Sequence, residues 1–119
     1  MKYINHWPDK AEIALPEEVS QDLQRQLLEP FDSVGEAKQF WQEAPSTIII
    51  LAPTDNITQL KESDIYSEIE FALTYPEYTV PLSMGYQLSV TIVNDSGSGI
   101  FLVIPPQLSH ITSIGVDKP

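Results

Sequence analysis

The chain has 119 residues, and its 17 Asp and Glu residues outnumber its 6 Lys and Arg residues, so its formal net charge is −11. So few bases argue against direct nucleic-acid binding and docking on anionic membranes, and the lack of cysteine excludes disulfides, thiolate nucleophiles and cysteine-ligated zinc. The hydrophobic share of 42% is typical of a folded protein, and the length predicts one domain over residues 1–119.

We do not expect the N-terminal segment to be a signal peptide. Residues 1–9 lack the apolar run of about 7 to 15 residues found in signal peptides. The longest apolar run, residues 48–53, is far shorter than the roughly 18 residues that suggest a membrane span. We therefore expect a cytoplasmic protein.

Two helices are expected in the first third of the chain. The first covers residues 16–29, where Pro16 suits the first helical position, acidic residues follow in the first turn, and Pro30 ends the helix. The second covers residues 33–44 and begins with a Ser-x-x-Glu capping box at Ser33.

The middle of the chain predicts a central strand and a third helix. Residues 47–51 form a β-branched run that is apolar on both faces, as in a strand covered on each side. Residues 53–61 form a polar connection. Residues 64–75, with Ser63 as N-cap, carry apolar residues at helical spacing, although some of them also alternate as in a strand; we prefer the helix.

A β-hairpin is the clearest expectation near the end of the chain. Apolar and polar residues alternate over residues 86–92, and a Gly- and Ser-rich loop leads to the apolar run 100–104. Residues 78–82 predict a strand that its proline confines to a sheet edge, and residues 111–116 predict a weak strand or a tail. The expected fold class is therefore α+β, with two or three helices packed on a mainly antiparallel sheet that contains a C-terminal β-hairpin.

The acidic charge is unevenly distributed along the chain. Residues 1–77 carry 15 acids and five bases, a net charge of −10, whereas residues 78–119 carry a net charge of only −1. Because the first part is mainly helical and the last part β, we expect an acidic helical side and a neutral sheet side.

Residues that could supply chemistry form no recognisable motif. The glycine loop at 95–99 has no lysine and is followed by a strand, which favours a hairpin turn over a phosphate cradle. His6 and His110 have no metal-ligand spacing, although pairing of the terminal segments would bring them together. Acidic pairs such as Asp64 and Glu68 are typical of solvated helix faces. We name no catalytic, cofactor-binding or metal-binding residue, and we expect no cofactor and favour a non-enzyme.

Aromatic residues are the remaining candidates for a site. Trp41 fits a helical core stripe, whereas four others are candidates for an interface or pocket: Trp7, Tyr75, Tyr78 and Tyr86. Tyrosine and tryptophan suit such positions because they combine apolar area with a polar tip. Core packing is the competing interpretation for each of them.

Several short patterns lie in the second half of the chain: Pro76-Glu77-Tyr78, Pro81-Leu82, the β run 86–93, the loop 95–99 and Ile104-Pro105. In these patterns, residues 64–105 resemble small uncharacterised proteins of bacterial mobile elements, of the kind found as integron gene cassettes. The resemblance implies a stand-alone accessory protein, a class that includes inhibitors, antitoxins and immunity proteins. It implies no activity and no site residues.

Two functional hypotheses follow. The first is a small acidic protein-interaction module, an accessory or inhibitor protein that binds a protein partner or itself, as a homodimer. Its charge would favour basic partners, including a nucleic-acid-binding surface that the acidic face mimics. The alternative is a small-molecule binding protein or enzyme with a pocket between helices and sheet, floored by residues of one face: Tyr86, Leu88, Val90 and Ile92.

Overall fold

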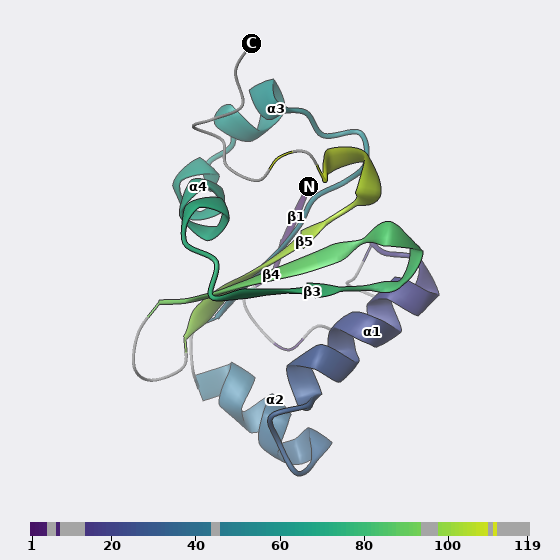
Figure 1. The fold of residues 1–119 in the computed structure, drawn as a ribbon. Coiled ribbons are helices and arrows are strands. Elements are labelled where there is room, and N and C mark those ends of the chain that lie inside the picture. The colour runs from purple at the N-terminus through teal and green to yellow at the C-terminus, as the bar shows by residue number, and fades with distance from the viewer. Residues whose placement is uncertain (5–6, 8–13, 44–45, 94–97, 110, 112–119) are drawn as a thin grey trace.

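Five strands of the described part of the chain form one sheet at the centre of the fold (Figure 1). The computed structural model describes residues 1–4, 7, 14–43, 46–93, 98–109 and 111. The strands lie in the order β1-β2-β5-β4-β3, with the bounds β1 (Lys2–Ile4), β2 (Thr47–Ile50), β3 (Tyr78–Pro81), β4 (Gln87–Ile92) and β5 (Gly99–Ile104). β2 and β5 pair in parallel, and the other three pairs are antiparallel, so the expected mainly antiparallel sheet is confirmed.

Helices cover both faces of the sheet. Helices α1 (Glu17–Leu28) and α2 (Val34–Glu43) lie on one side, and α3 (Ile57–Lys61) and α4 (Tyr66–Thr74) lie on the other (Figure 1). Two short 3-10 turns, η2 (Ser83–Gly85) and η3 (Pro106–Leu108), follow β3 and β5. The α+β class with a C-terminal hairpin of β4 and β5 is therefore confirmed.

The two N-terminal helices form close to where the sequence predicts them, although Pro16 is the N-cap of α1 and not its first helical residue. Ser33 begins α2 as expected, since its Oγ accepts a hydrogen bond from the Glu36 N–H at 3.1 Å. The Glu36 carboxylate reaches back to the N–H of Asp32, at 3.2 Å, one residue before the position that a regular capping box would use. The bond to Ser33 satisfies one of the amide groups that the first helical turn leaves without a partner.

The expectation of a polar connection over residues 53–61 was wrong in part, because α3 lies within it. Asn56 Oδ1 accepts from the Gln59 N–H, and Gln59 Oε1 accepts from the Asn56 N–H, both at 2.9 Å. This reciprocal capping starts α3, and the buried Leu60 packs the helix against the core on that side of the sheet. The part of the chain that the structure describes thus contains four α-helices rather than two or three.

The preference for a helix over a strand before Pro76 is confirmed by α4, although the helix starts at Tyr66, two residues later than expected. Ser63 caps the preceding turn, with its Oγ accepting from the Ile65 N–H at 3.1 Å. The helix is tied to the sheet by Thr91 Oγ1, which donates to the Ala72 carbonyl at 3.2 Å in a buried setting.

Two cores flank the sheet. Alternate residues of β2 and the residue after it supply them, with Ile48 and Ile50 packed toward α1 and α2, and Ile49 and Leu51 packed toward α3 and α4. The strand is therefore covered on each side, as its sequence predicts, while β5 occupies the central place in the sheet.

The expected division into an acidic helical side and a neutral sheet side was wrong. The β-rich last third lies between two helical layers, and all six residues of β5 are buried. Burial of the polar side of β4 shows why, since Ser89 and Thr91 lie beneath α4 rather than in solvent. β3 does form an exposed edge, as its sequence predicts. Residues 112–116 of the expected last strand lie outside the described residues.

Candidate functional site

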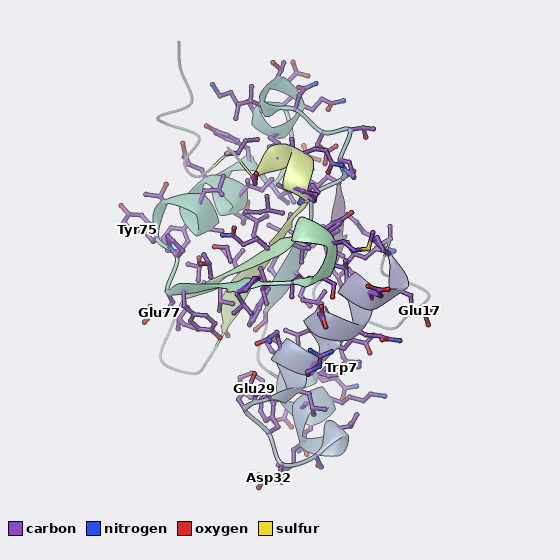
Figure 2. The ribbon with its side chains drawn as sticks, turned by 45° about the vertical axis from the view of Figure 1, so that its right-hand side comes forward. Trp7, Glu17, Glu29, Asp32, Tyr75 and Glu77 are labelled. Atoms are coloured by element: carbon purple, nitrogen blue, oxygen red, sulfur yellow. The ribbon has the colours of Figure 1, made fainter. Side chains whose placement is uncertain are left out.

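The four aromatic candidates occupy different environments. Tyr75, at the end of α4, and Tyr78, at the start of β3, are 64% and 53% exposed and flank Pro76 and Glu77. Figure 2 shows Tyr75 and Glu77 at the same corner of the molecule. Trp7, by contrast, packs against the core beneath α1 and α2.

Tyr86 belongs to that same core. Only 9% of its surface is exposed, and it precedes the first residue of β4, whereas Tyr78 pairs with Val90 near the other end of that strand. Leu88 and Val90 are also buried there against the helices, and Ile92 is exposed beyond them. The four aromatic candidates therefore do not form one site, and the expected pocket floor on this face is occupied by core packing.

The exposed aromatic surface includes a residue that the sequence-based prediction missed. Phe71 is 39% exposed, and its ring lies 5.3 Å from the ring of Tyr75, centroid to centroid, in a tilted arrangement. The i, i+4 spacing of these two residues on a helix was the available signal. We call Phe71, Tyr75 and Tyr78, which lie where α4 leads into β3, the aromatic edge; the side chain of Tyr78 points to the α1 side of the sheet, opposite α4.

Tyr78 lines a groove next to the end of α1. The other lining residues are Gln26, Glu29 and Pro30, and the groove has a volume of about 580 Å³. The side chains of this groove combine an aromatic ring and a proline with a carboxylate and an amide. An aromatic face beside a carboxylate suits a cationic side chain, because the ring and the acid both attract positive charge.

The backbone of β3 offers little for another strand to pair with. The Leu82 N–H donates to the Tyr86 carbonyl at 2.8 Å, so the backbone groups of Leu82 point toward β4. Because the direction alternates along an antiparallel strand, the N–H and C=O groups of Tyr78 and Val80 also point toward β4. The backbone groups of Thr79 and Pro81 point outward. Pro81 has no N–H to offer. A binding partner at this edge would therefore rely on side chains more than on strand addition.

A polar contact fastens the turn after β3 to α1. The carboxylate of Asp22 accepts hydrogen bonds from both the Oγ and the N–H of Ser83, and its other oxygen lies 2.7 Å from Arg25 Nη2. The bond from the Ser83 side chain, the bond from its backbone and the Arg25 charge together hold the pKa of Asp22 below its usual value, against the opposing effect of desolvation.

This contact predicts a pH-dependent contribution to stability. Since the folded-state pKa is depressed, the contribution is fully present above the unfolded value near 3.8 and is lost as the pH falls through the folded-state pKa. Asp22→Asn is expected to lower the free energy of unfolding at pH 7, with a difference from wild type that shrinks below about pH 4. Urea unfolding at pH 7 and pH 3 measures it; a difference of equal size at both pH values would contradict this role.

The described ranges contain no candidate metal site. No cluster of three or more His, Asp or Glu residues there is arranged to hold a metal ion. His6 and His110 lie outside the described residues, so their expected proximity stays a hypothesis. No helix in the described part of the chain is long and apolar enough to cross a membrane.

Comparisons with known proteins add no family. No family model, curated protein or solved structure matches the chain. The aromatic edge and the adjoining groove are therefore interpreted from their own geometry.

Proposed function

We propose that the protein is an acidic interaction module that binds a basic segment of a partner protein at the aromatic edge. The observation that carries the proposal is the groove that the exposed ring of Tyr78 and the carboxylate of Glu29 both line. A lysine or arginine side chain placed there would contact the ring face and pair with the acid. Tyr75 and Phe71 would add apolar contact around the corner.

The charge of the molecule supports a basic partner over a second copy of the chain. At a net charge of −11, two copies repel each other, whereas a basic partner is attracted from a distance and associates faster. Pro81 also limits pairing between two β3 edges. Self-association as a homodimer is the competing form of the proposal. From the resemblance alone, we also propose that the protein is an accessory or inhibitor protein of a mobile element.

Selection from random peptides tests the proposal for a partner of unidentified sequence. Displayed peptides of about 12 residues, selected on the immobilised protein, should become enriched in lysine and arginine. Tyr78→Ala and Glu29→Gln should each weaken binding of the selected peptides about tenfold or more, as expected for hot-spot positions. Binding should also weaken between roughly 50 and 500 mM salt, because exposed charges are screened.

Tyr3→Ala is the matched control, since Tyr3 is 48% exposed on β1, at the opposite edge of the sheet. It should leave peptide binding unchanged. Selected peptides without basic enrichment, or equal loss from Tyr3→Ala and Tyr78→Ala, would overturn the proposal. A dimer in sedimentation equilibrium that Tyr78→Ala dissociates would favour self-association instead.

A further inference from the structure

A second cavity lies on the other face of the sheet, between the end of α4 and strands β3 and β4. Its volume is about 120 Å³. Buried apolar side chains form much of its wall, namely Leu73, Ile104 and Ile111. The more accessible Thr79, Gln87 and Ser109 also line it, which places its mouth toward the β3 edge.

Ser89 is the least exposed of the described polar residues that line this cavity. It is only 3% exposed, yet no hydrogen bond joins its hydroxyl to any other residue that the structure describes. Its neighbour on the same face of β4 differs, because the Thr91 hydroxyl is bonded to the Ala72 carbonyl. No fully buried side-chain polar atom in the described part of the chain lacks a partner, so the Ser89 hydroxyl is open to the cavity rather than sealed from it. The cavity is the place from which a partner can reach Ser89.

The lining defines the chemistry of a suitable occupant. None of the described residues that line the cavity carries a charge, so an ion would lose its hydration without gaining a counter-charge from them. The apolar wall suits a compact hydrocarbon group, while Ser89 and Gln87 can donate and accept hydrogen bonds. A dry cavity of roughly 150 Å³ admits benzene, so a space of this size holds about five or six non-hydrogen atoms.

We propose that this cavity is a binding site for a small uncharged molecule with a compact hydrocarbon part and an alcohol or amide group. The polar group of the ligand bonds to Ser89 at the bottom of the cavity, and the hydrocarbon part packs against Leu73, Ile104 and Ile111. The site is separate from the aromatic edge groove, because the side chains of Thr79 and Ser89 lie on the opposite sheet face from Tyr78.

Isobutyramide is a suitable probe, because it has about six non-hydrogen atoms, a branched hydrocarbon part and an amide. Titration into the labelled protein, followed through backbone amide resonances, should shift Ser89, Ile104 and Leu73 with a dissociation constant in about the millimolar range. Isobutyrate is the matched probe with a charge and should not bind.

Ser89→Ala should weaken isobutyramide binding about fivefold, the expected effect of one lost hydrogen bond. Ser20→Ala is the control, because Ser20 is a buried serine on α1, at the other face of the sheet. Gln87→Ala tests the mouth independently and should also weaken binding.

Two results would overturn the proposal. The first is that these amide resonances do not shift at any isobutyramide concentration up to its solubility. Ordered water would then be the occupant of the cavity. The second is binding without selectivity, seen either as equal binding of isobutyrate or as equal affinity in Ser89→Ala, Gln87→Ala and wild type. Neither result bears on peptide binding at the aromatic edge, so the two proposals fail separately.

Discussion

Replacing Trp41 with alanine is expected to lower the free energy of unfolding by about 3–5 kcal/mol. The side chain of Trp41 is buried, with only 5% of the residue exposed, and joins three elements of the first core. Its N–H donates to the Leu27 carbonyl of α1 at 3.4 Å, and its ring meets that of Phe101 of β5 edge to face at 4.8 Å between centroids. Such a loss is a large share of the roughly 5–15 kcal/mol that stabilises a typical domain.

Urea unfolding followed by far-ultraviolet circular dichroism measures the effect. Trp41→Phe keeps an aromatic ring against Phe101 but removes the donor to Leu27, so it should cost less than Trp41→Ala. Phe40→Ala is a useful comparison, because Phe40 is only partly buried at the neighbouring position of α2. A loss below about 1 kcal/mol for Trp41→Ala would contradict the described packing of α2 on the sheet.

Leu102→Ala is expected to lower the free energy of unfolding by about 2–5 kcal/mol. Leu102 is fully buried in β5, on the face opposite Trp41, and is paired with Ile49 of β2 and Ser89 of β4. Its truncation leaves a void in the middle of the second core, between α4 and the central strands.

The same unfolding measurement applies, with two comparisons. Leu102→Met nearly conserves volume and should cost under about 1.5 kcal/mol. Val93→Ala should change stability by less than about 0.5 kcal/mol, because Val93 is 51% exposed just beyond β4. A small effect of Leu102→Ala would contradict the placement of β5 at the centre of the sheet.

The elements with strong local signals could be predicted from the sequence. Proline positions and acidic first turns indicated α1, and the Ser33 cap indicated α2. α3 was missed because its cap uses the Asn56 and Gln59 side chains within an otherwise polar segment of five helical residues. Such a short helix carries too few apolar positions for a periodic pattern, and its existence depends on the packing of Leu60 in the second core.

The candidate sites were harder to predict, because they depend on which face of each strand is covered. Alternation along β4 indicates two kinds of face but not that a second helical layer covers the polar one. The available signal was that the polar positions of β4 hold the small hydroxyl residues Ser89 and Thr91 rather than charged residues. The exposure of Tyr75 and Tyr78 was also hard to predict, because it depends on where α4 ends relative to the start of β3.

The position of β5 has a consequence for how the protein is made. This central strand pairs with both β2 and β4, and it contributes to both cores, yet it is the last strand along the described part of the chain. During synthesis, β1 through β4 emerge before the strand that joins them, and the two halves of the sheet cannot meet until residues 99–104 leave the ribosome. Folding of the sheet is therefore a late event that requires contacts distant in sequence, which makes it slower than folding through local contacts.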